Sequence, residues 1–295
     1  MTLATHPFAD PVGTTLSTVG VVGGGLMGAG IADVCARTGH DVVVVESTEQ
    51  AAKAALGRLE ESLERAENRG KLSSASDTLN RIRVVSDLDA MCDRDLVVEA
   101  IVEEEGAKVA LFRRLDGIVA TPDAILASNT SSIPIMKLGM VTSRPTQVIG
   151  IHFFNPVPVL ELVEIVPSLL TSADTTHRTR QWVEVQLGKQ AVECRDRAGF
   201  VVNALLIPFI LSAIRMFESG FASVEDIDRA LVLGAAHPQG PLRLADLIGL
   251  DTTKAVAQSL YDEFKEALYA PPPLLQRLVE AGQLGRKSGR GFYTY

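Results

Sequence analysis

Short β-branched runs alternate with helical segments over the first two thirds of the chain. Strands are predicted at Val19–Val22, Val42–Glu46, Ile82–Val85, Leu96–Val98, Ile125–Ala127, Val148–Ile151, Glu161–Val166 and Gln190–Val192. The helical segments between them include Ala51–Arg69, Glu104–Ala120 and Ala173–Leu187. Because strands that alternate with helices form βαβ units, the pattern predicts an α/β domain with a mainly parallel sheet.

The pattern changes after Gly199. An almost wholly apolar run, interrupted by Pro208, predicts a buried helix with a local bend over Val201–Phe217. Such a helix needs cover on more than one side, which either intramolecular packing or a dimer interface supplies. Ser223 is typical of a helix N-cap, and Pro241 and Asp251 are predicted to open two further helices.

These two patterns predict two domains. Residues 1–197 are expected to form the sheet domain, and residues 198–295 an all-helical domain. Within the first, residues 1–15 carry prolines and a glycine but no basic residue, and we expect them to be a loose N-terminal extension rather than a signal peptide.

A glycine-rich turn joins the first predicted strand to a helix of small residues. Gly23 allows a tight turn, Gly25 lets the backbone approach a pyrophosphate, and Gly28 lets the helix pack against the strand. The N–H groups at the start of the helix would then face the phosphates. This Rossmann-type fingerprint predicts dinucleotide contacts at Gly23, Gly24, Gly25, Leu26, Met27 and Gly28.

Glu46, at the end of the second predicted strand, completes the fingerprint. Its carboxylate is expected to accept hydrogen bonds from the two hydroxyls of an adenosine ribose. The same charge would repel a 2′-phosphate, so NAD is predicted in preference to NADP. The alternative is a glycine-rich turn in an α/β domain that binds no nucleotide.

A second group of polar residues follows the strand that begins at Val148. His152 lies at the carboxyl end of that strand, where ligands bind in open α/β sheets. Pro156 and Pro158 force an extended turn, after which the chain returns with Glu161 and Glu164. A carboxylate brought back to the histidine would make it a general base held in one tautomer. Alternatively, the histidine simply packs among Phe153 and Phe154.

The segment Ser128–Ser132 also lies at the carboxyl end of a predicted strand. Its hydroxyls have two interpretations: hydrogen bonds to a substrate oxygen, or ordinary turn and N-cap positions.

Composition excludes several classes of protein. A net charge of −8 argues against a nucleic-acid partner, which requires a basic face. The three cysteines, Cys35, Cys92 and Cys194, fit neither a disulfide framework nor a zinc site, and favour the reducing cytoplasm. No apolar stretch is long enough to span a bilayer, and no metal-ligand cluster is visible. We therefore expect a protein with neither a metal nor a membrane partner.

Together these segments resemble the L-3-hydroxyacyl-CoA dehydrogenase family, which includes the bacterial 3-hydroxybutyryl-CoA dehydrogenases. The matching stretches run in order from Thr18 to Tyr295 and include DLVVEAIVE, ASNTSSIPI, GIHFFNPVPVLELVEIV, DRAGFVVNALL and GRKSGRGFYTY. The resemblance implies a homodimeric NAD enzyme of fatty acid β-oxidation or butanoate metabolism, acting on acyl-CoA. Two departures are Glu46, where the family commonly has Asp, and Arg69, where it can carry Lys.

The resemblance also implies roles for individual residues. His152 would be the base that takes the proton of the 3-hydroxyl group, and Glu164 its orienting partner. Ser131 would hydrogen-bond the substrate oxygen and lie against the nicotinamide, and Asn203 would hold the acyl group. Glu161 would be structural or solvent-facing. The implied contacts to the nicotinamide half of the cofactor are Glu103, Lys108, Asn155 and Lys287, and those to coenzyme A are Ser62 and Arg69.

Two other functions remain open at this point. One is a related dehydrogenase that acts on a free hydroxy acid, which retention of the Ser62 and Arg69 contacts would argue against. The other is a non-catalytic NAD-binding protein, which the presence of His152, Glu164 and Ser131 argues against.

Overall fold

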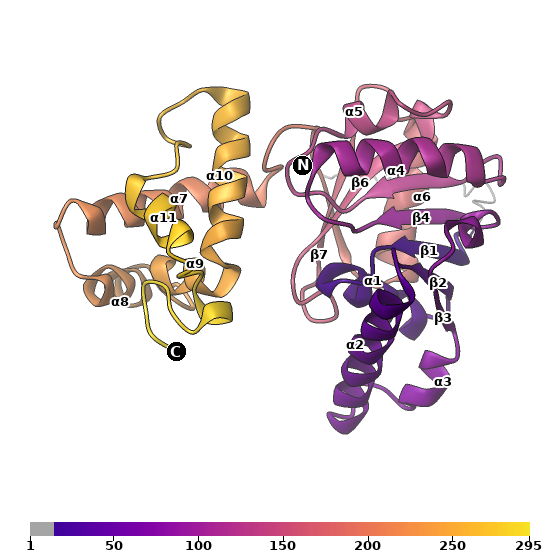
Figure 1. The fold of residues 1–295 in the computed structure, drawn as a ribbon, viewed down its shortest axis with the longest axis horizontal. Coiled ribbons are helices and arrows are strands. Elements are labelled where there is room, and N and C mark those ends of the chain that lie inside the picture. Colours follow the sequence, from indigo (N-terminus) through magenta and orange to yellow (C-terminus); the bar gives the residue numbers. More distant parts are fainter. Residues whose placement is uncertain (1–14) are drawn as a thin grey trace, which may run out of the picture. The chain divides into compact units, whose positions relative to one another are not determined.

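The computed structural model describes residues 15–295, which form two compact units (Figure 1). The first contains the chain up to Thr130 together with Pro134–Asp196, and the second consists of Ser131–Ile133 and Arg197–Tyr295. The N-terminal extension expected at residues 1–15 lies outside the described residues, apart from Thr15, which is exposed.

An eight-stranded sheet forms the first unit, in the order β3-β2-β1-β4-β5-β6-β7-β8. Its strands are β1 (Thr18–Val22), β2 (Asp41–Val45), β3 (Ile82–Val85), β4 (Leu96–Glu99), β5 (Ile125–Ser128), β6 (Val148–Phe153), β7 (Leu162–Pro167) and β8 (Gln190–Glu193). The pairing of β6 with β7 is antiparallel and every other pair is parallel. This confirms the predicted mainly parallel sheet, with each strand within one or two residues of its predicted bounds.

Helices cover both faces of this sheet (Figure 1). They are α1 (Leu26–Arg37), α2 (Glu49–Asn68), α3 (Ala75–Leu79), α4 (Glu105–Ile118), α5 (Ile135–Gly139) and α6 (Ala173–Gln181). Helices α1 and α2 lie on one side of the sheet, and α4 and α5 on the other. Residues alternate accordingly: Val19 and Val21 belong to one core cluster with Ile31 of α1, whereas Gly20 between them faces Met91 and Arg94 on the other side. Both faces are therefore buried, as parallel sheets require.

The segment predicted as one helix over Ala173–Leu187 has two parts. After α6 the chain continues as a π-helix over Trp182–Gln186. Trp182 is fully buried in the core beside Phe153, at 6.3 Å between ring centroids. The wider turn brings this large side chain onto the sheet.

The second unit is helical, as predicted. Its helices are α7 (Val202–Glu218), α8 (Val224–Ala235), α9 (Pro241–Ile248), α10 (Leu250–Phe264) and α11 (Pro273–Glu280). Ser223 caps α8 as predicted, since its hydroxyl accepts from the Asp226 N–H at 3.1 Å. Helix α10 begins one residue before the predicted Asp251. Within residues 15–295, no helix has both the length and the apolar character needed to cross a bilayer.

The prediction of a buried α7 is only half right. Its central residues, among them Ile210, Leu211 and Ile214, form the core of the second unit with Leu242. Leu205 in its second turn is nevertheless 73% exposed. The other helices of this unit cover only part of α7. The hydrophobicity of the sequence therefore overestimated how much of α7 is buried.

Candidate active site

The glycine turn has the geometry of a phosphate-binding loop. Gly23 has a φ of 97°, and a Cβ there would lie 2.6 Å from the Ala100 carbonyl oxygen. Gly25 is the N-cap of α1 and offers no side-chain cap, and a Cβ on it would meet nothing within 4 Å. At Gly28 a Cβ would lie 1.7 Å from the Gly23 carbonyl oxygen. The third glycine therefore closes the turn on itself, in addition to its expected role in helix–strand packing.

The turn lies where ligands bind in open α/β sheets. Strand β1 pairs with β2 on one side and with β4 on the other, so the strand order reverses between β1 and β4. The N–H groups at the start of α1 point into this crevice, and Leu26 in its first turn is 67% exposed. The residues present thus fit a dinucleotide whose pyrophosphate rests on the N-terminus of α1.

Glu46 directly follows β2 and reaches the glycine turn. Its Oε1 accepts a hydrogen bond from the Gly24 N–H at 2.7 Å, and its Oε2 accepts from the Ser47 N–H at 3.1 Å. From α2, Arg58 donates through Nη1 to the Gly24 carbonyl at 3.1 Å. Sequence reasoning missed Arg58, which stands among acidic residues on a helix with no motif of its own.

The expected return of a carboxylate to His152 is confirmed. The antiparallel register of β6 and β7 pairs His152 with Glu164 directly, and Nδ1 of the imidazole lies 2.7 Å from the Glu164 Oε2. His152 is 7% exposed and Glu164 is fully buried. The Phe154 ring lies against the imidazole at 4.5 Å between centroids, whereas Phe153 faces the opposite side of the sheet. The pair fixes the ring and makes Nε2 the nitrogen turned away from the carboxylate.

The loop that joins β6 to β7 is held by Lys189. Its buried ammonium donates to the carbonyl oxygens of Val157 and Leu160, at 2.8 and 2.7 Å. Burial lowers the pKa of Lys189, and the charge of nearby Glu161 opposes this. Asn155 lies exposed at the start of this loop. Lys189 had no predicted role, because a lysine before an edge strand looks like a surface residue.

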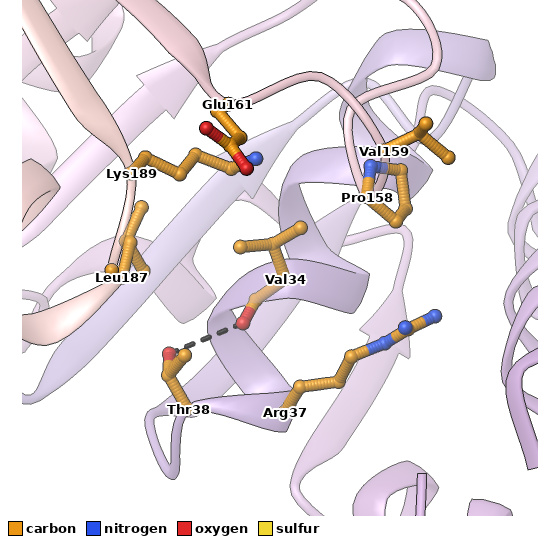
Figure 2. A pocket seen from close by; sticks show the side chains of 9 residues that line it. Val34, Arg37, Thr38, Pro158, Val159, Glu161, Leu187 and Lys189 are labelled. Carbon is orange, nitrogen blue, oxygen red and sulfur yellow. Dashed lines mark hydrogen bonds between the residues drawn. The ribbon is translucent and has the colours of Figure 1, made fainter. Parts of the chain in front are cut away.

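Glu161 is exposed, as expected of a residue outside the chemistry. With Lys189 it lines a shallow pocket of about 280 Å³ over the last turns of α1 (Figure 2). The other residues of this pocket are Val34, Arg37, Thr38, Pro158, Val159, Leu187 and Gly188. The imidazole of His152 is not among them, so this pocket is separate from the histidine–glutamate pair.

Lys108 and Glu103 lie together at the carboxyl end of β4, but Lys108 is buried. Only 1% of it is exposed, and its ammonium contacts Glu99 at 2.5 Å and Glu103 at 3.1 Å. Glu103 is the accessible member, with 37% of its side chain exposed. Glu99 is fully buried and was missed by sequence reasoning, since a glutamate that ends a hydrophobic strand gives no sign of its partners.

Ser62 and Arg69 lie on one side of α2. The Ser62 hydroxyl donates to Asp33 of α1 at 2.5 Å, and Arg69 is exposed at the C-terminal end of the helix. With Arg58 and Arg65 they occupy positions i, i+4, i+7 and i+11, which share one helix face. The acidic residues Glu60, Glu64 and Glu67 fall on another face, so the helix presents a basic stripe, although Glu61 borders it and pairs with Arg65 at 3.7 Å.

Three predicted site residues belong to the second unit. Asn203 lies half-buried in the first turn of α7, and Ser131 begins the short segment Ser131–Ile133. Lys287 contacts Asp251 at 2.6 Å. Burial favours a raised pKa for Asp251, but the hydrogen bond and charge of Lys287 outweigh it and hold the pKa below its usual range. Between Thr15 and Tyr295, no three histidine, cysteine or carboxylate side chains gather as metal ligands would.

Comparisons with known proteins agree with this geometry. The NAD-binding domain profile of 3-hydroxyacyl-CoA dehydrogenase matches residues 18–197, and the profile of the C-terminal domain of the same enzymes matches residues 199–295. The combination of glycine turn, sheet and helical unit is thus that of a nicotinamide-dependent oxidoreductase. The chain belongs to the 3-hydroxyacyl-CoA dehydrogenase family.

Individual relatives support the assignment. A 3-hydroxybutyryl-CoA dehydrogenase from Mycobacterium tuberculosis is 56% identical over 282 residues, which cover 95% of this chain and 99% of that protein. The crystal structure of FadB2 from M. tuberculosis has a TM-score of 0.94 at 55% identity, covering 95% of this chain and 99% of that one. An (S)-3-hydroxybutyryl-CoA dehydrogenase from Ralstonia eutropha has a TM-score of 0.90 at 44% identity, with the same coverage.

Proposed function

We propose that the chain interconverts (S)-3-hydroxyacyl-CoA and 3-ketoacyl-CoA with NAD, and that 3-hydroxybutyryl-CoA is its substrate. The observation that carries this proposal is the buried His152–Glu164 pair at 2.7 Å. His152 lies near the carboxyl end of its strand, and the glycine turn likewise follows the carboxyl end of β1. The relatives named as 3-hydroxybutyryl-CoA dehydrogenases, with identities up to 56%, support the choice of substrate.

His152 provides the acid–base chemistry in this proposal. The nicotinamide ring, when bound, exchanges a hydride with C3 of the substrate. As the C3–H bond breaks in the oxidation, Nε2 of His152 takes the proton of the 3-hydroxyl group and the C=O bond forms. In the reduction, the imidazolium returns that proton to the 3-keto oxygen. Glu164 holds Nδ1 and stabilises the positive charge of the ring.

The remaining residues bind and orient the two ligands. Ser131 hydrogen-bonds the reacting oxygen, and Asn203 holds the acyl group. The nicotinamide half of the cofactor is contacted by Glu103, Lys108, Asn155 and Lys287, and coenzyme A by Ser62 and Arg69. The basic stripe on α2 suits the phosphates of coenzyme A, since arginine binds phosphate in a bidentate manner.

Substrate class is tested by measuring NADH oxidation with acetoacetyl-CoA and with free acetoacetate. We expect turnover with the thioester and at least about 100-fold lower kcat/KM with the free acid, because the acid lacks every contact to the nucleotide portion. The substitution Arg69→Ala should raise KM for acetoacetyl-CoA several-fold and leave the KM for NADH unchanged. Comparable kcat/KM for both substrates would instead favour the dehydrogenase of a free hydroxy acid.

Glu46 sets the preference for NAD over NADP in this proposal. Glu46→Gln keeps a hydrogen-bond acceptor for the Gly24 N–H while removing the charge that repels a 2′-phosphate. We expect the ratio of kcat/KM for NADH over NADPH to fall by about tenfold, the effect of about 1.4 kcal/mol. Glu49→Gln, a change in the first turn of α2, is the matched control. An unchanged ratio would place the discrimination elsewhere.

We also propose that the protein acts in the cytoplasm as a homodimer. All three cysteines are free thiols, which suits a reducing compartment. Leu205 of α7 and Val201, the residue just before this helix, are exposed apolar side chains. Light scattering measures the molar mass of wild type and of Leu205→Glu. We expect wild type to have the mass of a dimer and Leu205→Glu that of a monomer, because a charge buried in the interface would dissociate the dimer.

A further inference from the structure

Five polar residues close a ring at the carboxyl ends of β4 and β5, four through their side chains and Thr130 through its hydroxyl and its backbone N–H. The Glu99 carboxylate accepts from the Lys108 ammonium at 2.5 Å and from the Ser128 hydroxyl at 2.5 Å. Lys108 also contacts Glu103 at 3.1 Å, and Glu103 accepts from the Thr130 hydroxyl at 2.6 Å. The Thr130 N–H donates to the Ser128 oxygen at 3.2 Å, which completes the circuit. Each member is therefore oriented by two neighbours.

The ring is joined to the glycine turn. The Ile101 N–H donates to the Glu99 Oε1 at 2.8 Å, which fixes the chain just after β4. A Cβ on Gly23 would lie 2.6 Å from the Ala100 carbonyl oxygen and 3.0 Å from the Ile101 nitrogen. The backbone that Glu99 holds is therefore the backbone against which the turn packs, on the β4 side of the crevice.

The sheet order places this ring at the nicotinamide end of the cofactor. Glu46 marks the adenosine side, because it follows β2 and holds Gly24. A dinucleotide that crosses the carboxyl end of β1 from that side reaches β4 and β5 with its other half. The ring members differ in depth: Glu99 and Lys108 are buried, whereas Glu103 is 37% exposed. Besides its own proposed contact with the cofactor, Lys108 therefore also acts on this part of the site by holding Glu103.

We propose that Glu99 is a positioning residue for the nicotinamide ring of the cofactor. Through Lys108 it fixes the carboxylate of Glu103, and through Ser128 it fixes Thr130, the residue before Ser131. This inference rests on the proposed function, because it assumes that NADH occupies the crevice. In Glu99→Gln the new amide nitrogen is a further donor at a site that already receives three, the Lys108 ammonium, the Ser128 hydroxyl and the Ile101 N–H. One of these contacts is therefore lost.

ADP-ribose distinguishes positioning from general structural support, because it carries the adenosine and both riboses but no nicotinamide ring. Binding of NADH and ADP-ribose to the whole protein is measured by titration calorimetry. For Glu99→Gln we expect about tenfold weaker NADH binding, the effect of one hydrogen bond to a charged group. ADP-ribose binding should change less than about twofold. Thr130→Val, which opens the ring at its other end, should show the same selectivity with a smaller loss.

Glu105→Gln is the matched control, because Glu105 lies on the same helix as Lys108 but forms an exposed ion pair, with Lys137 of α5 at 2.8 Å. Its binding of both ligands should equal that of wild type. Equal losses of NADH and ADP-ribose in Glu99→Gln and Thr130→Val would overturn the inference, as would no loss in either. If Glu99→Gln does not fold, Thr130→Val decides alone. Wild type that binds no NADH would instead refute the proposed function itself.

Discussion

Two buried acid–base pairs lie on the same face of the sheet, and they are built in different ways. His152 and Glu164 meet across one antiparallel register of β6 and β7. Glu99 and Lys108 meet within a closed ring that draws on β4, α4 and the end of β5. One nitrogen of the His152 imidazole holds Glu164 and the other can exchange a proton with a ligand, whereas the Lys108 ammonium directs its hydrogens to Glu99 and Glu103. The His152–Glu164 pair is therefore suited to proton transfer, and the Glu99–Lys108 pair to holding neighbouring residues in place.

The largest expected effect on stability concerns the ring. Lys108→Met removes the ammonium and leaves Glu99 as a buried charge without its cation, so the free energy of unfolding should fall by about 3–5 kcal/mol. Glu105→Gln breaks an exposed pair and should change it by less than about 1 kcal/mol. Urea unfolding followed by circular dichroism measures both. Equal losses would contradict the contrast drawn between the ring and a surface ion pair.

The next largest effect is expected from the His152–Glu164 pair, and it concerns kcat rather than stability. Glu164→Gln leaves the His152 ring without its anionic partner, so kcat should fall by about 10–100-fold, less than the loss of the base itself. NADH binding should not change. The matched control is Glu161→Gln, an exposed glutamate just before the same strand, which should retain wild-type kcat. If Glu161→Gln lost as much activity as Glu164→Gln, the assignment of the partner carboxylate would be wrong.

The smallest expected effect on stability concerns Asp95, whose carboxylate joins the start of β1 to the residue just before β4. Burial favours a raised pKa for Asp95, but hydrogen bonds from the N–H and hydroxyl groups of Thr18 and Ser17 outweigh it and lower the pKa. A lowered folded-state pKa stabilises the protein above the unfolded value near 4 and is lost as the pH falls through the folded value. Asp95→Asn should therefore cost up to about 1 kcal/mol at pH 7, since the site is largely solvated, and progressively less as the pH falls below about 4. Thermal unfolding at pH 7 and at pH 2.5 checks this, and an undiminished loss of stability at pH 2.5 would contradict it.

The sequence was sufficient for features that depend on neighbours along one strand or turn. The sheet and the glycine turn follow from alternation and from glycine spacing, and the prolines at Pro156 and Pro158 predict that the chain returns a carboxylate to His152. The pattern left Glu161 and Glu164 both open, and the family resemblance chose Glu164, because the register of an antiparallel pair is not fixed by the prolines alone.

Features that depend on several distant segments were not foreseen. The ring joins Glu99, Lys108 and Thr130, each of which has an ordinary local explanation as a strand end, a helix lysine or a turn residue. Arg58 reaches Gly24 across 34 residues, and nothing in the local sequence indicates that contact. The exposure of Leu205 depends on how much of α7 the other helices cover, which hydrophobicity does not state.

The most direct test of the account is the rate of a single turnover in His152→Ala. NADH and acetoacetyl-CoA are mixed with excess enzyme at saturating concentrations, and NADH absorbance is followed in wild type, in His152→Ala and in His177→Ala, an exposed histidine of α6. The account predicts that His152→Ala binds NADH normally but transfers hydride about 1,000-fold more slowly, while His177→Ala matches wild type. A His152→Ala rate within a few-fold of wild type would contradict the assignment of His152 as the acid–base group.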